Sequence, residues 1–308
     1  MTEKVLFITD PFDDLNIKKD TSILMMEESF KNSYKVFQCE TSDLFIENAK
    51  VYASSKNIIQ NKSKFVAEND KFDLNITDFK ICFMRKDPPV DENYINALHL
   101  LGLAESLGAN IYNKPNSLKN FNEKVFAVHF FKYIPKTIIT SNIQKIEKFF
   151  QKQKSIVIKP LDGMGGNSIY KIDELNNKNI NLIKLMTKSG LTKIICQEFI
   201  EDVYSGDVRI LIINGEPFRK TLARIPQKGH FKGNLAAGGR GIARDITDFQ
   251  EQLGKEIGTF LMTNGISFAG IDVIGEYLTE INITSPTCAR EIYDQTNLNP
   301  ISELFKDL

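Results

Sequence analysis

The chain has 308 residues, of which 42% are hydrophobic and 25% are charged, and Lys+Arg 39 are balanced by Asp+Glu 39. This length allows two domains, since a domain commonly holds about 100–200 residues and can then bury its own core. The balanced charge argues against a nucleic-acid-binding protein, which needs a basic surplus on at least one face.

The sequence predicts neither a membrane segment nor a secretion signal. No stretch approaches the roughly 20 apolar residues needed to cross a bilayer, and the apolar run at residues 5–8 is too short for a signal peptide. Four cysteines lie far apart, without a C-x-x-C pair: Cys39, Cys82, Cys196 and Cys288. This spacing favours reduced thiols over disulfides or a zinc site. We therefore expect a soluble cytoplasmic protein.

The first 121 residues alternate between strand and helix patterns. Strands are predicted at residues 5–9, 34–38, 80–84 and 110–112. Helices are predicted at residues 21–30, with Asp20 as the N-cap, and at residues 93–107, which Gly108 ends. Such alternation predicts an α/β domain, residues 1–121, built on an open and mostly parallel sheet.

The pattern changes near Asn113-Lys114-Pro115, and we place a domain boundary near Phe121. One helix is predicted at residues 118–131, followed by strands at 137–140, 155–159 and 194–197 and helices at 143–150 and 175–187. Beyond Lys193 short strands dominate, and Asn214-Gly215 predicts a tight hairpin turn between strands at 208–213 and 217–225. The second domain, residues 122–308, is therefore of α+β type, with a central lid part (122–200) and a C-terminal catalytic part (201–308).

The first candidate for chemistry is the segment 156–169, in which an apolar strand delivers Lys159 into a glycine-rich turn. Glycines allow backbone N–H groups to approach a phosphate closely. A glycine-rich hairpin by itself is more often a plain turn. A lysine within an apolar strand favours the functional interpretation, because it needs an anionic partner.

The second candidate is an acidic hairpin at residues 270–283. Glu280 and Asn282 point to one face of a strand, and Asp272 lies on the preceding strand. Oxygen donors on one wet face suit magnesium, although a merely solvated outer face is about as probable on this pattern alone. A two-residue Gly275-Glu276 turn would place Asp272 opposite Thr279, so shared metal binding predicts a loop of odd length that pairs Asp272 with Glu280.

The third candidate is the loop 225–240, rich in small residues around 233–241. Its glycines, with Asn234 and Arg240, suit a flap that closes over phosphate. A plain flexible connection is the alternative.

In chain order these segments resemble the ATP-grasp ligases, and more closely the bacterial glutathione synthetase family. The resemblance rests on residues 159–166 (KPLDGMGG), 223–226 (ARIP), 233–241 (GNLAAGGRG), 279–288 (TEINITSPTC), 16–21 (NIKKDT) and 84–89 (MRKDPP). It extends over essentially the whole chain and implies an ATP-grasp fold behind an open-sheet N-terminal domain. The RKDPP and GNLAAGGRG segments are the more specific ones, whereas the lysine and the EIN segment occur across ATP-grasp enzymes.

This resemblance implies roles for the matching positions. The nucleotide is expected on Lys124, Lys159, Gly163, Gly165, Gly166, Glu198, Phe199, Ile200 and Asp207. Magnesium, with manganese as a substitute, is expected on Asp272, Glu280 and Asn282. The dipeptide substrate is expected on Arg85, Asn282, Ser285, Thr287 and Arg290. The catalytic set is Arg224, Arg209, Asn234 and Arg240. The Glu198-Phe199-Ile200 hinge differs in side chain from related hinges, but adenine is held there largely by backbone groups.

The implied reaction converts ATP, γ-glutamylcysteine and glycine into glutathione, ADP and phosphate through an acyl phosphate. Phosphoryl transfer requires positioning and charge neutralisation rather than a protein nucleophile. The family also implies a homo-oligomer, a tetramer, with no nucleic-acid or membrane partner. The alternatives are another ATP-grasp carboxylate–amine ligase, of D-Ala-D-Ala or glutamate-ligase type, and a non-enzymatic ATP-binding protein. The segment 85–89 argues against the other ligases, and Lys159, Asp272, Glu280 and Asn282 argue against mere binding.

Overall fold

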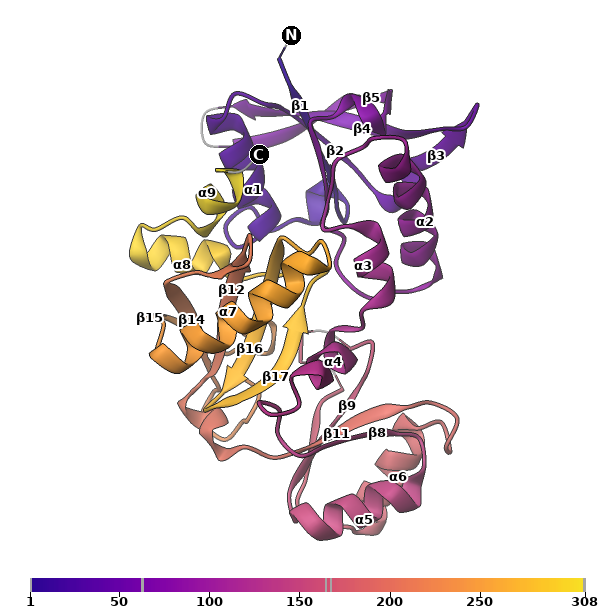
Figure 1. Ribbon diagram of the computed structural model, residues 1–308. Helices are drawn as coiled ribbons and strands as arrows, with labels where there is room; N and C mark the ends of the chain where they lie inside the picture. The colour runs from indigo at the N-terminus through magenta and orange to yellow at the C-terminus, as the bar shows by residue number, and fades with distance from the viewer. Residues whose placement is uncertain (1, 62–63, 164, 167, 307–308) are drawn as a thin grey trace.

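The computed structural model describes residues 2–61, 64–163, 165–166 and 168–306, which form three successive sheets (Figure 1). The first sheet comprises β1 (Lys4–Ile8), β2 (Lys35–Cys39), β3 (Leu44–Glu47), β4 (Lys50–Asn61), β5 (Lys64–Asn75), β6 (Ile81–Met84) and β7 (Ile111–Tyr112). Its order is β3-β4-β2-β1-β6-β7, with β5 paired to β4. Helices α1 (Thr21–Lys31) and α2 (Glu92–Ser106) accompany it, and the Asp20 side chain caps α1 as predicted, accepting from the Ser22 amide.

The first sheet is parallel only in part. Strand β1 pairs in parallel with β2 and β6, and β6 with β7, as the strand–helix alternation predicted. The three strands between Leu44 and Asn75 were not predicted, and they pair antiparallel with β2 and with one another. They extend one edge of the parallel sheet into a long hairpin.

The single helix predicted at residues 118–131 is wrong. The structure has α3 (Pro115–Asn120), α4 (Glu123–Phe126) and the 3-10 helix η4 (Ala127–Phe130). The break occurs at Asn122, which adopts extended φ and ψ and accepts hydrogen bonds from the amides of Lys124 and Val125. A short polar side chain that caps the next turn competes with continuing the helix through it.

The second sheet is a four-stranded antiparallel unit with its own core. It has the order β10-β9-β11-β8 and consists of β8 (Thr137–Thr140), β9 (Ile156–Pro160), β10 (Tyr170–Ile172) and β11 (Ile194–Glu198). Helices α5 (Ile143–Gln153) and α6 (Asn177–Met186) lie together against it at the far end of the molecule (Figure 1). Buried Ile146, Ile158 and Ile183 belong to a core that contains only residues of this unit.

The third sheet has the order β15-β14-β12-β16-β17, with β13 paired to β12. Its strands are β12 (Asp207–Ile213), β13 (Glu216–Pro217), β14 (Lys220–Ile225), β15 (Arg240–Asp245), β16 (Phe268–Ile274) and β17 (Tyr277–Asn282). The predicted Asn214-Gly215 turn is confirmed, since Ile213 pairs with Glu216 and both turn residues have positive φ. Helix α7 (Asp248–Thr263), which was not predicted, packs against this sheet.

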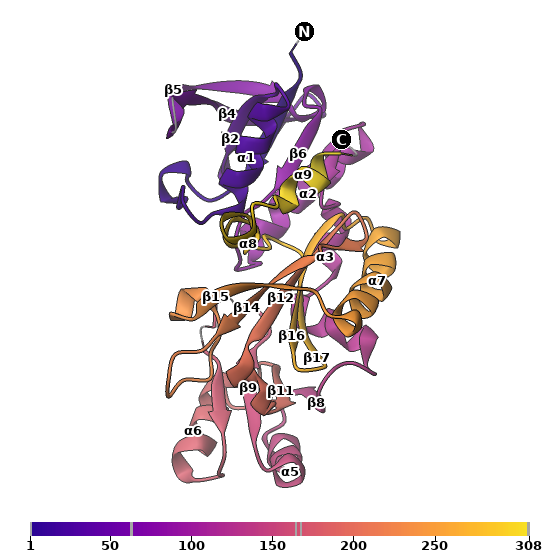
Figure 2. The ribbon, with the colours of Figure 1, turned by 90° about the vertical axis from the view of Figure 1, so that its left-hand side faces the viewer.

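The C-terminal helices α8 (Ala289–Thr296) and α9 (Pro300–Phe305) return to the first sheet and lie beside α1 (Figure 2). One core cluster includes Phe83 of β6, Leu211 of β12 and Phe305 of α9. The first and third sheets therefore share buried cores. The remaining 3-10 helices are η1 (Phe12–Asp14), η2 (Thr41–Asp43), η3 (Ile76–Asp78), η5 (Glu201–Ser205) and η6 (Leu235–Ala237). Among the described helices, none combines the length and apolar character that a bilayer crossing requires.

Candidate active site

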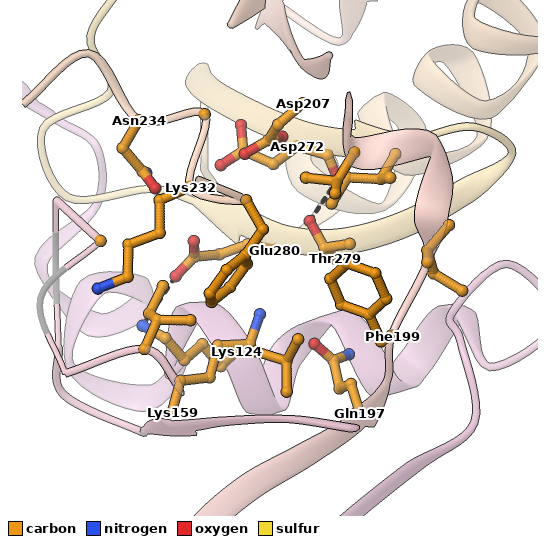
Figure 3. A pocket seen from close by; sticks show the side chains of 18 of the residues that line it. Lys124, Lys159, Gln197, Phe199, Asp207, Lys232, Asn234, Asp272, Thr279 and Glu280 are labelled. Atoms are coloured by element: carbon orange, nitrogen blue, oxygen red, sulfur yellow. Dashed lines mark hydrogen bonds and ion pairs between the residues drawn. The ribbon is translucent and has the colours of Figure 1, made fainter. Parts of the chain in front are cut away.

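A cleft lies between the second and third sheets, and it gathers residues that are far apart in the sequence. Figure 3 shows Lys124 and Lys159 on one side of it and Asp207 and Asp272 on the other, with Glu280 between them. Apolar walls come from Val157, Ile169, Val203, Phe231 and Ile274. All nine residues expected to bind nucleotide line this cleft: Lys124, Lys159, Gly163, Gly165, Gly166, Glu198, Phe199, Ile200 and Asp207.

Lys124 and Lys159, two of the lysines that line the cleft, differ in their partners. Lys124 Nζ lies 2.8 Å from Glu280 Oε1 and donates to the Gly163 carbonyl at 2.6 Å. Burial lowers the pKa of Lys124, but Glu280 outweighs burial and the pKa is raised. Lys159 is 8% exposed, has no ion-pair partner among the described residues, and has a pKa lowered by burial. A buried ammonium of this kind favours an anionic ligand.

The glycine-rich turn is covered by the loop between β14 and β15. Ile225 pairs with Arg240, so residues 226–239 form the connection of a hairpin. A Cβ atom on Gly166, which has φ of 82°, would lie 2.8 Å from Asn234 Oδ1. The glycine at position 166 therefore allows the loop to dock directly onto the turn, and Asn234 also lines the cleft.

A buried network of ions joins the strands at the base of the cleft. The Asp272 carboxylate accepts from Arg209 Nε at 2.5 Å and from Arg209 Nη2 at 3.0 Å. Arg224 Nη2 lies 2.9 Å from Asp272 Oδ1 and 2.7 Å from Asp207 Oδ1. Burial raises the pKa of Asp272, but the two arginines outweigh it and hold that pKa well below its usual range. Asp272 is therefore ionised at neutral pH, and it holds Arg209 and Arg224 next to the acidic side of the cleft.

The register of the acidic hairpin confirms the predicted pairing of Asp272 with Glu280. The predicted loop of odd length is wrong, because Ile274 pairs with Tyr277 across a two-residue turn. A bulge between the pairs Val273↔Leu278 and Asp272↔Glu280 makes Thr279 the extra residue. One extra residue reverses the alternation of side chains beyond it, so Asp272 and Glu280 share a face despite the even turn.

Of the residues expected to hold a metal, Asp272 and Glu280 line the cleft with carboxylates, and Asn282 lies beside Asp272. Asn282 donates through Nδ2 to Asp272 Oδ2 and to the Gly270 carbonyl, both at 3.2 Å, so its Oδ1 is the atom left for a ligand. No cluster of three His, Cys, Asp or Glu side chains with metal-site geometry occurs in the part of the chain that the structure describes. Carboxylate and amide oxygens fit a divalent cation that also binds phosphate and water. Asp272 would share its carboxylate between such a cation and the arginines.

A second cavity adjoins the cleft at Asp272 and Glu280. It is lined by several of the residues expected to bind substrate or to act in catalysis: Arg209, Arg224, Asn234, Asn282, Ser285 and Thr287. Cys288 also lines it. The two cavities together form a continuous lining from the glycine-rich turn to the segment after β17.

Three arginines expected at the site do not line either cavity. Arg85 is buried after β6, donates to Ser22 Oγ at 3.2 Å and to the Pro286 carbonyl at 3.0 Å, and has an unpartnered buried Nη1. Arg290 lies 2.6 Å from Glu27 and has an unpartnered buried Nε. Arg240 is exposed at the start of β15.

Sequence reasoning did not assign roles to several lining residues. These are Asp87, Glu123, Gln197, Phe231 and Lys232. Asp87 and Lys232 lie inside or beside quoted motifs, and Glu123 precedes Lys124, so their neighbours provided a signal. Gln197 precedes the predicted hinge residue Glu198 and Phe231 lies within the predicted loop 225–240, but their residue types gave no indication that their side chains face the cleft.

Comparisons of family models and of related sequences point to one family along nearly the whole chain. The family model for the N-terminal domain of prokaryotic glutathione synthetase matches residues 4–119, and that for its ATP-grasp domain matches residues 123–297. Glutathione synthetase of Buchnera aphidicola subsp. Baizongia pistaciae (strain Bp) is 43% identical over 310 residues, covering 100% of this chain and 95% of the relative. That of Escherichia coli (strain K12) is 40% identical over 292 residues, covering 94% and 92%.

Solved structures share the fold at low sequence identity. D-cycloserine synthetase DcsG superposes with a TM-score of 0.69 at 11% identity, covering 99% of both chains. The macrocyclase MdnC from Microcystis aeruginosa, bound to its precursor peptide, gives 0.65 at 15% identity and the same coverage. The ATP-grasp ligase PsnB, in complex with a minimal precursor, gives a TM-score of 0.64 at 15% identity, covering 99% of this chain and 97% of PsnB, so the chain shares the ATP-grasp fold.

Proposed function

The chain belongs to the prokaryotic glutathione synthetase family, and on that basis we infer that it joins γ-glutamylcysteine to glycine at the expense of ATP. The products are glutathione, ADP and phosphate. The observation in the structure that best supports this activity is buried Lys159, which has no ion-pair partner among the described residues and lies across the cleft from Asp207 and Asp272. A cleft of this charge pattern favours a polyphosphate together with a cation.

We propose that ATP lies in the cleft between the second and third sheets. Lys124 and Lys159 would neutralise phosphate oxygens, and the turn at Gly163, Gly165 and Gly166 would present backbone N–H groups to them. Adenine would lie against the hinge at Glu198–Ile200. The apolar side chains of Phe199 and Ile200, which line the cleft, support this placement. Asp207 would face the nucleotide from the third sheet.

The family uses a divalent metal with ATP, and we propose that it is magnesium, with manganese as a substitute. Glu280, Asn282 and Asp272 would hold it through oxygen atoms. When bound, such an ion neutralises developing charge on the transferred phosphoryl group, which is worth several kcal/mol in comparable sites.

The remaining steps concern the dipeptide carboxylate. Its oxygen attacks the γ-phosphorus of ATP, ADP leaves, and a mixed carboxylic–phosphoric anhydride forms. The glycine amine then attacks the acyl carbon, the C–O bond to phosphate breaks, and the amine loses a proton as the amide forms. We propose that Arg209 and Arg224 stabilise the negative charge at the acyl centre, supported by their position at the wall of the second cavity. Asn234 already lines both cavities, and the loop 225–240 that carries it would exclude water from the acyl phosphate; Arg240, exposed at the start of β15, would reach the site only if this loop moved.

We propose that the dipeptide occupies the second cavity. Asn282, Ser285 and Thr287 line it. Arg85 donates to the Pro286 carbonyl next to this lining and Arg290 pairs with Glu27, and each has one buried guanidinium nitrogen without a partner in the described structure. An orphaned guanidinium N–H favours a carboxylate, which supports their assignment to the carboxylates of the substrate.

The domain division, the assembly and the compartment are part of the same proposal. The helix break at Asn122 supports a boundary near Phe121, giving residues 1–121, 122–200 and 201–308. We propose a homotetramer because the family resemblance implies one, and analytical ultracentrifugation would give its mass. Exposed apolar side chains on β3 to β5 would suit a subunit interface: Ile46, Ile59, Val66 and Phe72. Four buried free cysteines are compatible with a cytoplasmic location.

The test is ADP release by the purified protein with ATP, magnesium and γ-glutamylcysteine, with and without glycine. Glycine should be required for release and for a stoichiometric yield of glutathione. D-alanine or glutamate, supplied in place of the dipeptide and glycine, should not support release. Release driven by D-alanine alone would assign the chain to another carboxylate–amine ligase, and ATP binding without release would favour a binding protein.

A further inference from the structure

The backbone just after β17 is held by side chains instead of a neighbouring strand. The amides of Ile283 and Thr284 donate to Glu123 Oε1 at 2.7 Å and 3.0 Å, and Thr284 Oγ1 donates to the same oxygen at 2.9 Å. The Ile283 carbonyl accepts from Asn113 Nδ2 at 2.8 Å. Ile283 and Thr284 are both buried, so these polar groups need partners and obtain them from distant side chains.

Glu123 stands in a run of three residues that contact three parts of the site. Asn122 donates through Nδ2 to the Leu161 carbonyl at 3.0 Å, next to the glycine-rich turn. Lys124 contacts the Gly163 carbonyl and the Glu280 carboxylate. Glu123, between them in the sequence, accepts hydrogen bonds from the two backbone amides that follow β17. The short helix α4 therefore fixes the turn, the acidic strand and the segment after it in one arrangement.

The segment that Glu123 holds leads into the second cavity. Residues 283–287 include Ser285 and Thr287, which line that cavity, and the Pro286 carbonyl, which accepts from Arg85 Nη2 at 3.0 Å. Glu123 itself lines the same cavity. A shift of this segment would move the proposed dipeptide contacts while leaving β9 and the nucleotide side in place.

We propose that Glu123 is a positioning residue for the ligation: its carboxylate fixes the dipeptide-binding segment 283–287 relative to Lys124 and the nucleotide. This inference rests on the proposed function, because it assigns the dipeptide to the second cavity. Glu123 needs no contact with the reacting atoms in this role. Its effect passes through the backbone of Ile283 and Thr284.

The test compares Glu123→Ala with Glu123→Gln. Alanine leaves two buried amides without an acceptor, and we expect the KM for γ-glutamylcysteine to rise about 10-fold or more, with the KM for ATP changing by less than about 2-fold. Glutamine has a side chain of the same length with an acceptor oxygen, so Glu123→Gln should restore the KM for γ-glutamylcysteine to near the wild-type value. Glu256→Gln is the matched control, because Glu256 also accepts two hydrogen bonds, from Lys132 and Tyr133, but lies outside both cavities.

Hydrogen exchange supplies a measurement that needs no substrate. In Glu123→Ala, amides in a peptide covering residues 283–288 should exchange faster, whereas those of β9 should be unchanged. The proposal would be overturned if the KM values for ATP and for γ-glutamylcysteine rose equally, if Tm fell in parallel, and if Glu123→Gln recovered neither. That result would show a merely structural role. Unaltered exchange and kinetics would overturn it as well. If the wild type forms no glutathione, the proposed function fails, and the exchange result still decides whether Glu123 holds the segment.

Discussion

Replacing Lys159 with methionine should stabilise the protein without nucleotide while weakening nucleotide binding. Lys159 is buried, has no ion-pair partner in the described structure, and has a lowered pKa, so burial outweighs the nearby carboxylates. Burying an uncompensated polar group costs about 1–3 kcal/mol in proteins, and methionine of similar length removes that cost. We expect Lys159→Met to raise the free energy of unfolding by about this amount.

Lys124→Met is the matched control with the opposite expected sign. Lys124 is equally buried but is paired with Glu280 at 2.8 Å, so its loss leaves a carboxylate without its partner. We expect the free energy of unfolding to fall by about 1–3 kcal/mol. Both variants should lose about 10- to 100-fold in ADP affinity, since each would remove a charged hydrogen-bond donor that we propose for phosphate.

The pH dependence of the difference in unfolding free energy between Lys159→Met and the wild type gives a further check. The folded-state pKa of Lys159 lies below its ordinary value of 10.5, so the unfolded chain binds more protons between the two values. The stability of the wild type therefore rises with pH in that interval, and the advantage of Lys159→Met should shrink as pH approaches 10.5. Urea unfolding at several pH values and calorimetric titration with ADP measure both effects. A Lys159→Met protein that is as destabilised as Lys124→Met, or that binds ADP as tightly as the wild type, would refute the reasoning.

Three further predictions concern the metal, the dipeptide and the loop. Glu280→Gln should lower turnover by about 100-fold or more, because it would remove the anionic metal ligand that we propose, while far-ultraviolet circular dichroism stays unchanged. Arg85→Lys should raise the KM for γ-glutamylcysteine about 10-fold but not that for ATP, because lysine lacks the Nη1 donor, which has no partner in the described structure while Nε and Nη2 donate to Ser22 and Pro286. Shortening the loop 225–240 should preserve ATP binding but let phosphate release exceed glutathione formation, since water then reaches the acyl phosphate.

Each of these has an outcome that contradicts it. Full turnover of Glu280→Gln at limiting magnesium would exclude Glu280 as a metal ligand. An unchanged KM and turnover in Arg85→Lys would make Arg85 a structural residue that only supports Ser22 and Pro286. A shortened loop with full activity and a one-to-one ratio of phosphate to glutathione would show that the loop merely connects β14 and β15.

Local features of the fold were predictable where a few adjacent residues decide the conformation. Asn214-Gly215 gave the hairpin turn, because both positions take positive φ, and Asp20 gave the start of α1. The helix predicted at residues 118–131 failed because apolar spacing continues through Asn122, whose side chain caps a new helix there. The three strands between Leu44 and Asn75 were missed. Strand β4 pairs with β2, and β3 and β5 pair with β4, and the local sequence does not reveal these partners.

The sequence by itself determined the family and the chemical groups of the site: the lysine before the glycine-rich turn, the acidic strand and the small-residue loop. These are properties of contiguous segments, in which residue type and spacing act locally. Only the tertiary structure decided which groups meet. Asp272 pairs with Arg209 across 63 positions of the chain, the bulge at Thr279 turns Glu280 to the same face, and Glu123 holds Ile283 from 160 positions away. Such contacts depend on strand register and on the burial of polar groups that need a partner. Both bring together residues far apart in the chain, so the neighbouring sequence does not indicate the partner.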